Sequence, residues 1–224
     1  MNRIKDIIKV IDQISGRYSA YEVFTDWIRC MAMSICNTVS PIHDKVWQER
    51  EQSYMDTMRK YTPEEQVKLC EMMLWLVETL DDGPYDVLGK IYMDAGMGSK
   101  AAGQFFTPFH LSVLTAKMSL GESIESYRDE MTKLDINEPT CGGGAMIIAA
   151  AKVLQDEGIN YQKVMKVVAQ DLDWKGVYMC YVQLSLLGID AICVQGNTLA
   201  DPYVPGKTDR SHIMRTPKNM GVLL

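Results

Sequence analysis

The residues best suited to chemistry lie in the stretch INEPTCGGGAM, at residues 136–146. Gly142, Gly143 and Gly144 follow one another there, directly before an alanine-rich apolar segment. Glycines let the backbone turn tightly, and they let a ligand approach without a Cβ in the way. A helix that begins at such a turn directs unpaired N–H groups and a partial positive charge towards it. The turn could therefore hold a carboxylate or a phosphate, although a plain glycine turn between a strand and a helix has the same composition.

An acidic residue lies at the end of the next apolar run. Asp171 comes 27 residues after Gly144 and could accept both hydroxyls of a ribose from a strand tip. The glycines do not have the G-x-G-x-x-G spacing of dinucleotide-binding proteins, and Glu138 would repel a pyrophosphate but attract an ammonium group. S-adenosylmethionine has a ribose, a carboxylate and an ammonium group, so it suits these residues. Asp173 is instead expected to cap the following helix.

These residues must be positioned by a sheet and its helices. Short apolar segments alternate with longer segments of helical periodicity from about residue 130 onwards. The predicted strands are 133–137, 165–170 and 190–195, and the predicted helices are 142–158 and 173–188. Strand, helix, strand, helix and strand in this order are typical of a parallel α/β sheet. Ligands bind such sheets beyond the carboxyl ends of the strands, where Asp171 and the glycines would lie.

The first hundred residues have the periodicity of helices. Isoleucines at helical spacing open the chain: Ile4, Ile7, Ile8, Ile11 and Ile14. A later helix is predicted to begin after Thr62, with Pro63 in the first helical position and Glu65 closing a capping box. Its apolar face is predicted to consist of Val67, Cys70, Leu74 and Val77. We therefore expect a helical domain over residues 1–100 and an α/β domain over residues 101–224.

Composition and charge limit the classes of function. The chain has 224 residues, 47% of them hydrophobic, and no apolar run as long as a membrane span. Residues 61–140 hold 6 basic and 14 acidic side chains, so action on DNA would call for a partner that supplies much of the contact. The six cysteines form no C-x-x-C pair, and the charged N-terminus is not a signal peptide. Reduced, buried thiols in a cytoplasmic protein are expected rather than a metal site.

Four spaced motifs resemble those of adenine-N6 DNA methyltransferases. NEPTCGGGAM (137–146) is similar to motif I of that family, which usually reads Asp-Pro-x-Cys-Gly-x-Gly, and GQFFTP (103–108) is similar to motif X. AQDLDW (169–174) resembles the family's second-strand region, and GNTLADP (196–202) resembles motif III. The stretch DVLGKIYMDAG, which precedes GQFFTP, looks closest to the modification subunit of type I restriction–modification systems. The match covers roughly residues 84–202, and its ordered motifs are more specific than any one of them.

The resemblance implies a helical domain followed by a Rossmann-like sheet that binds S-adenosylmethionine or S-adenosylhomocysteine. Phe106, Thr107 and Pro108 would lie over the methionine part of the cofactor, and Thr107 could cap a helix that starts at Pro108. Glu138 replaces the usual Asp opposite the cofactor's ammonium group. Asn197 stands near the adenine ring where the family often has Asp, or it belongs to an ordinary Gly-Asn turn. The implied cofactor-binding residues are Phe106, Thr107, Pro108, Glu138, Thr140, Gly142, Gly144, Asp171, Leu172 and Asn197.

The family's catalytic motif IV, Asn/Asp-Pro-Pro-Tyr/Phe, does not occur in the sequence. In the family its polar side chain and carbonyl accept the hydrogens of the adenine amine, and its ring stacks on the flipped base. Asp201, Pro202 and Tyr203 come closest in letters, but they contain one proline and follow the third strand too soon. We expect the sheet to be truncated after the third strand, which leaves an edge where a second copy or another partner could bind.

Three functions are compatible with these patterns. The first is an adenine-N6 DNA methyltransferase family protein that binds its cofactor and is inactive alone or dependent on a partner subunit that contacts DNA. The second is a catalytically inert interaction or regulatory module that retains the methyltransferase fold. The third is an S-adenosylmethionine enzyme with another substrate. Motifs X and I favour the first two, and the missing motif IV favours the second with respect to chemistry.

Overall fold

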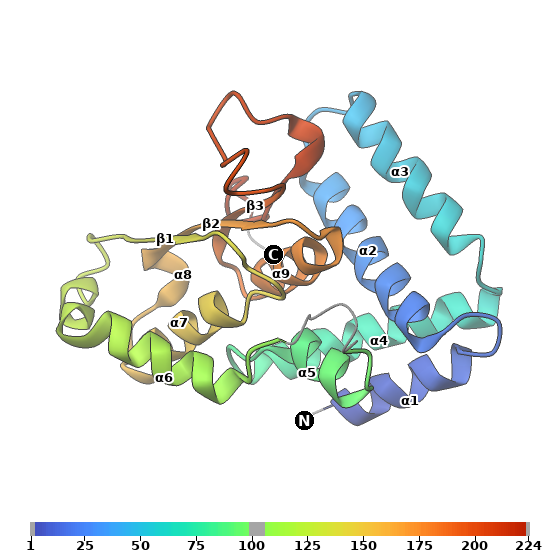
Figure 1. Ribbon diagram of the computed structural model, residues 1–224, viewed down its shortest axis with the longest axis horizontal. Helices are drawn as coiled ribbons and strands as arrows, with labels where there is room; N and C mark the ends of the chain where they lie inside the picture. Colours follow the sequence, from blue (N-terminus) through green and yellow to red (C-terminus); the bar gives the residue numbers. More distant parts are fainter. Residues whose placement is uncertain (1–2, 99–105, 223–224) are drawn as a thin grey trace.

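The helical half of the protein comes first in the chain and lies beside the sheet (Figure 1). The computed structural model describes residues 3–98 and 106–222. The helices of the first described range are α1 (Ile4–Ile14), α2 (Ala20–Val39), α3 (Lys45–Met58), α4 (Pro63–Asp81) and α5 (Val87–Asp94). The second range opens with α6 (Phe109–Leu120) and the short 3-10 helix η1 (Gly121–Tyr127).

The sheet half alternates strands and helices, as the sequence predicts. Its elements are β1 (Leu134–Glu138), α7 (Ala145–Asp156), α8 (Tyr161–Val164), β2 (Met165–Asp171), α9 (Trp174–Leu186), β3 (Asp190–Gln195), η2 (Arg210–His212) and β4 (Ile213–Arg215). The strand order is β1-β2-β3-β4, and β1, β2 and β3 run parallel. Figure 1 shows α7 and α9 on the same side of this sheet. The predicted fold class, a helical part followed by a partial Rossmann-like sheet, is confirmed.

The strand register brings the three carboxyl ends together at one edge of the sheet. Glu138 at the end of β1 is level with Ala169 in β2, and Asp171 at the end of β2 is level with Gln195 at the end of β3. The apolar side chains of β2 alternate in the way that a sheet face requires, because Met165, Val167 and Ala169 are buried while Lys166 is exposed. The loops that carry the predicted motifs therefore leave the sheet side by side.

The sheet does not end after its third strand, which corrects that part of the sequence prediction. The short strand β4 pairs antiparallel with β3, from Ile192 opposite Arg215 to Val194 opposite Ile213. Thr216 fixes the end of β4, because its hydroxyl accepts from the Ala191 N–H at 3.0 Å and donates to the Ile189 carbonyl at 2.7 Å. Strand β4 has three residues, which are too few to show the alternation of apolar and polar side chains that identifies a strand in a sequence. Because β4 pairs with β3, β3 is not an edge strand. The two edge strands of the sheet are β1 and β4.

The two halves share a continuous hydrophobic core. Helix α9 is buried along nearly its whole length, and it contacts both the sheet and α2. One cluster of buried side chains includes Ile7 of α1, Trp27 of α2 and Ala169 of β2. The predicted domain boundary at residues 100 and 101 lies outside the described residues, so the division into two domains stays a prediction.

Helix α4 begins as predicted but buries a different face. Thr62 caps it in a complete capping box with Glu65, and Pro63 is its first residue. The predicted core positions Val67 and Leu74 are 59% and 63% exposed, and Cys70 is exposed as well. The buried face consists of Leu69, Met72, Leu76 and Leu80. The helix carries two apolar stripes of the same period, and contacts from elsewhere in the chain, including a hydrogen bond from Trp27 Nε1 to the Leu69 carbonyl, decide which one is buried.

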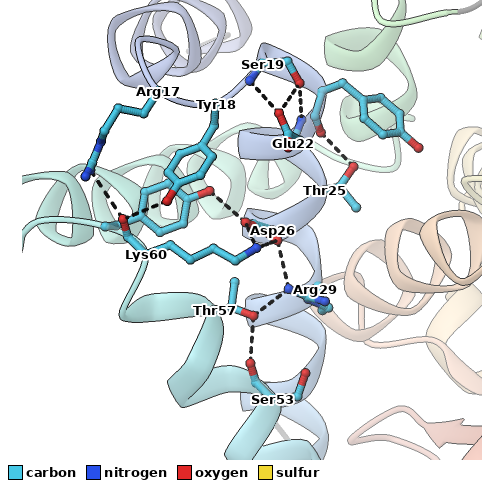
Figure 2. Close-up of polar contacts among 12 residues, drawn as sticks. Arg17, Tyr18, Ser19, Glu22, Thr25, Asp26, Arg29, Ser53, Thr57 and Lys60 are labelled. Atoms are coloured by element: carbon cyan, nitrogen blue, oxygen red, sulfur yellow. Dashed lines mark hydrogen bonds and ion pairs between the residues drawn. The ribbon is translucent and has the colours of Figure 1, made fainter.

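An ionic cluster around the buried Asp26 joins α2 to the end of α3 and to the turn before α4 (Figure 2). Asp26 is 7% exposed and accepts from Lys60 Nζ at 3.0 Å, from Arg29 Nη2 at 2.9 Å and from the Tyr61 hydroxyl at 3.0 Å. Arg29 Nη2 also donates to Thr57 of α3 at 2.6 Å. Burial and the Asp26 carboxylate raise the pKa of Tyr61, which keeps its hydroxyl a donor. Removing Asp26 would leave the buried Tyr61 hydroxyl and the partly buried Arg29 guanidinium without this acceptor.

The cysteines and helices bear on two further expectations. All six cysteines are free thiols, and five of them are buried while Cys70 is exposed. The expectation of buried thiols therefore holds for five of the six. Along the described ranges, no helix combines the length and the apolar character needed to span a membrane.

Candidate cofactor site

The three glycines form the predicted turn between β1 and α7. Gly142 and Gly144 have φ angles of +49° and +90°, in the left-handed region that favours glycine. Gly144 is the N-cap of α7, and its N–H donates to the Cys141 carbonyl at 2.8 Å. A Cβ at Gly144 would lie 3.0 Å from the Cys180 Sγ, so α9 packs directly against the turn. Strand, glycine turn and helix start are thus confirmed.

Asp171 holds this turn in place. Its Oδ2 accepts from the Gly142 N–H at 2.8 Å, and its Oδ1 accepts from the Asp173 N–H at 2.9 Å. A second bond ties the same loops, from the Cys141 N–H to the Gln170 carbonyl at 2.9 Å. Each carboxylate oxygen has a further lone pair, so the half-buried Asp171 can still accept hydrogen bonds from a ligand.

The first turn of α9 forms the next wall of the site. Asp173 caps this helix as predicted, accepting from the Lys175 N–H at 3.0 Å. A Cβ at Gly176 would lie 3.3 Å from both the Gly142 Cα and the Asp171 Cγ. The absence of a side chain at Gly176 therefore lets α9 approach the glycine turn closely.

Phe106 and Thr107 form a further part of the wall beside the glycine turn. A Cβ at Gly142 would be 3.1 Å from the Phe106 Cε1, and the Phe106 ring stands edge-on to Tyr92 with centroids 5.1 Å apart. The predicted cap is wrong: Pro108 is the N-cap of α6, the helix begins at Phe109, and Thr107 makes no capping bond. Pro108 has an extended ψ of 129°, so the helix starts one residue later than predicted. The first three residues of GQFFTP, 103–105, lie outside the described residues.

These elements enclose a cavity of about 280 Å³. Its described lining residues are Phe106, Thr107, Thr140, Cys141, Gly142, Gly143, Ala145, Met146, Asp171, Asp173, Lys175 and Gly176. Five of the predicted cofactor-binding residues are among them: Phe106, Thr107, Thr140, Gly142 and Asp171. The volume lies near the lower limit of about 300 Å³ for small-molecule sites. A second cavity, of about 640 Å³, adjoins it at Phe106 and Thr107 and includes Pro108.

Two of the other predicted residues belong to the framework of the turn. Glu138 ends β1, and its Oε1 accepts from the Thr140 N–H at 3.3 Å. Gly144 caps α7 and packs on Cys180. Neither lines the cavity, so their contact with a cofactor stays a prediction.

Leu172 and Asn197 lie in the loops after β2 and β3. Leu172 is 67% exposed, and its carbonyl accepts from Gln195 Nε2 at 2.8 Å. Asn197 is exposed and accepts from the Leu199 N–H at 3.0 Å, which is the ordinary turn that the sequence left open. The neighbouring Thr198 nevertheless bonds the Pro139 carbonyl at 2.8 Å, so this loop lies beside the one after β1. The structure brings both residues near the site without placing them in its wall.

The loop after β3 carries the residues that come closest in letters to motif IV, Asp201, Pro202 and Tyr203. Gln170 binds their backbone, because its Nε2 donates to the Asp201 carbonyl at 2.9 Å and its Oε1 accepts from the Tyr203 N–H at 3.1 Å. Asp201 and Pro202 are exposed, and Tyr203 is half-buried. None of the three lines the cavity that Asp171 and Phe106 share.

Comparison with known proteins connects this geometry to a family. The family model of N-6 DNA methylases matches residues 84–219, which is more than half of the chain. The chain belongs to the N-6 DNA methylase family. Among solved structures, it is similar to a candidate class I S-adenosylmethionine-dependent methyltransferase from Listeria monocytogenes, with 15% sequence identity and a TM-score of 0.41. The similarity covers 90% of this chain but only 55% of that protein, so the chain spans about half of its length. The comparison with curated proteins gave no match.

The cavity also contains a lysine, Lys175, that the sequence analysis did not identify. The Lys175 side chain is 5% exposed, and its Nζ lies 3.2 Å from the Tyr92 hydroxyl and 3.5 Å from Asp173 Oδ2. Burial lowers the pKa of Lys175, but Tyr92, Tyr21 and Asp173 outweigh it and the pKa is raised overall, so the side chain is an ammonium group. Tyr92 lies 83 residues earlier in the chain, so local spacing could not reveal the contact. The sequence feature that could have pointed to Lys175 is the presence of a lysine in the first turn of an otherwise apolar helix.

A series of buried hydrogen bonds connects α5 to the glycine turn. Gln183 Nε2 donates to both the Gly143 carbonyl and Asp86 Oδ1 at 2.9 Å. Gln183 Oε1 accepts from the Leu88 N–H at 3.0 Å, and Asp86 caps α5 by accepting from the Gly89 N–H at 3.0 Å. Burial raises the pKa of Asp86. Gly143 lines the cavity, so these hydrogen bonds fix the position of a peptide in its wall.

Proposed function

We propose that the cavity between the glycine turn, Asp171 and Phe106 binds S-adenosylmethionine and its product S-adenosylhomocysteine. One observation carries the proposal. Three motif residues from separate parts of the chain (Phe106, Gly142 and Asp171) line one cavity at the carboxyl ends of parallel strands. That is the place where open α/β sheets bind nucleoside ligands. Membership of the N-6 DNA methylase family supports the same cofactor.

Each wall of the cavity suits a different part of this cofactor. Asp171 has lone pairs left for the ribose hydroxyls, since each of its oxygens accepts from one backbone N–H group. The start of α7 at Ala145 offers a partial positive charge to an anionic group. Phe106 adds an apolar surface. When bound, S-adenosylmethionine supplies the electrophilic methyl group that a methyltransferase passes on.

We further propose that the chain acts on adenine-N6 in DNA only together with a partner subunit, as a type I modification subunit does. Three observations support this. The Asn/Asp-Pro-Pro-Tyr/Phe motif does not occur in the 224 residues, and Asp201, Pro202 and Tyr203 lie outside the cavity wall. The acidic segment 61–140 disfavours contact with phosphates, so the partner would supply most of the DNA contact. Free thiols suit the cytoplasm as its place of action.

Two observations favour the second function, an inert module that retains the fold. Both Asp171 oxygens already accept backbone N–H groups, and the cavity is small. An acid used only to brace a turn would give this geometry as well. Cofactor binding separates the two functions, because the inert module needs none.

Two assays test the proposal. Titration calorimetry of the pure chain should show binding of S-adenosylhomocysteine, and no heat with either cofactor form would contradict the cofactor site. Radiolabelled methyl transfer to unmethylated genomic DNA should show no labelled adenine with the chain alone and labelling once a partner subunit is added. Robust labelling by the chain alone would contradict partner dependence and would direct mutagenesis to Asp201, Pro202 and Tyr203. A second copy of the chain at the β1 edge is the alternative partner, and sedimentation of the pure protein detects it.

A further inference from the structure

Lys175 is the one basic side chain among the described residues that line the cavity. Its position is unfavourable for a cation on two counts. The side chain is 5% exposed, and burial of an ammonium group costs free energy. It also lies in the first turn of α9, where the helix dipole already contributes partial positive charge. A buried cation at this position must be stabilised by neighbouring groups, and its presence in the cavity wall calls for a functional explanation.

The structure that holds Lys175 comes largely from the helical half of the chain. Tyr21 of α2 and Tyr92 of α5 face the ammonium group, with ring centroids 5.3 and 4.8 Å from Nζ. Such distances give a cation–π attraction. The Tyr92 ring in turn contacts Phe106, which lies over Gly142. The lysine is thus fixed at the same wall as the glycine turn.

We propose that Lys175 binds the carboxylate of the cofactor's methionine part and so selects ligands that carry this group. The inference rests on the proposed cofactor site. Of the groups in S-adenosylhomocysteine, the carboxylate is the only anion, and the ammonium group would be repelled by Lys175. The ribose hydroxyls are served by Asp171, which is an acceptor. The tyrosines and Asp173 hold the Lys175 ammonium group in one place, so the lysine side chain loses little entropy when the ligand binds.

Two ligands separate this role from a structural one. S-adenosylhomocysteine has the carboxylate, whereas 5′-methylthioadenosine has the same adenosine and thioether but lacks the whole amino-acid part. Titration calorimetry with Lys175→Met should show S-adenosylhomocysteine bound about tenfold or more weakly, and methylthioadenosine bound as in the wild type within about twofold. Lys175→Arg should retain part of the preference. Lys45→Met is the matched control, because Lys45 also follows a capping aspartate in a first helical turn but is 87% exposed.

Each outcome has a definite meaning. An equal loss for both ligands would show that Lys175 only supports the fold of the site, and no loss for either would show that it does not contact the cofactor; both results overturn the inference. Thermal melting of Lys175→Met confirms that the variant is folded. If the wild-type chain binds neither ligand, the cofactor site itself is wrong. If the wild type binds both ligands equally well, the cofactor site stands and the inference is overturned.

Discussion

At the scale of single residues, Asp171 is expected to act in two ways at once. Its carboxylate ties the glycine turn to the end of β2 through the Gly142 N–H, and it presents its further lone pairs to the cavity. A ligand that uses these lone pairs binds a group that is already held in position, which lowers the entropy lost on binding. The ribose is the part of the cofactor that this acid suits.

Asp171→Ala should weaken the binding of both S-adenosylhomocysteine and methylthioadenosine by about tenfold or more, because both ligands have the ribose and hydrogen bonds to a charged acceptor are lost. Calorimetric titration measures the two affinities. Asp201→Ala is the control, because Asp201 is an exposed acid that does not line the cavity. Unchanged affinities in Asp171→Ala would mean that Asp171 only braces the turn.

A second residue-scale prediction concerns Asp86. Its folded-state pKa is raised by burial, so the protonated form is favoured in the folded protein. The corresponding stabilisation is complete below the unfolded pKa and is lost as pH rises through the folded pKa. The free energy of unfolding of the wild type, relative to Asp86→Asn, should therefore increase as the pH falls from about 7 to about 4. Urea unfolding at several pH values measures this difference, and a constant difference would be evidence against a raised pKa.

At the scale of elements, the positions of turns and strands follow from the sequence, whereas the choice of which helix face is buried does not. Capping residues at Thr62 and Asp173 and the glycine turn were predictable because each depends on neighbours a few residues away. The parallel pairing of β1, β2 and β3 was predictable from the alternation of strands and helices along the chain. The buried face of α4 was predicted wrongly because distant contacts select one of its two apolar stripes. The start of α6 was misplaced by one residue, and β4 was too short to recognise.

The candidate site shows the same division. Five of the predicted cofactor residues line the cavity because motif spacing places loops at strand ends. Lys175 and Gln183 were missed because their partners Tyr92 and Asp86 lie 83 and 97 residues away. Such contacts arise only when α5 docks on α9.

Gly144→Ala tests how tightly the turn packs between β1 and α9. A Cβ there meets the Cys180 Sγ at 3.0 Å, whereas a Cβ at Gly158 meets nothing within 4 Å; both glycines have positive φ. Each substitution should cost about 1–2 kcal/mol in backbone strain, and only Gly144→Ala should cost about 1–3 kcal/mol more from overpacking. Urea unfolding of both variants measures the costs. Equal losses of stability in the two variants would show that α9 moves to accommodate the Gly144→Ala Cβ without a further cost in free energy of unfolding.

At the scale of the whole molecule, the helical half supports the site in the sheet half. Tyr21 and Tyr92 hold Lys175, and Asp86 holds the glycine turn through Gln183. One cluster of buried side chains runs through both halves. Cofactor binding should therefore stabilise the chain as a unit.

Thermal unfolding should accordingly show a single transition. At a free concentration of S-adenosylhomocysteine about 100 times its Kd, this transition should move as a whole by about 5–10 °C, which corresponds to about 2.7 kcal/mol for a chain of this size. Differential scanning calorimetry with and without the ligand measures the shift. Two transitions, of which only one responds to the ligand, would indicate domains that unfold independently.

The most direct test of the central claim is a crystal structure of the chain grown with saturating S-adenosylhomocysteine. The account predicts density for one ligand in the cavity between Phe106, Gly142 and Asp171. The ribose hydroxyls should lie within hydrogen-bond distance of the Asp171 carboxylate, and the ligand carboxylate should lie near Lys175 Nζ. An empty cavity, or a ligand bound elsewhere on the molecule, would contradict it.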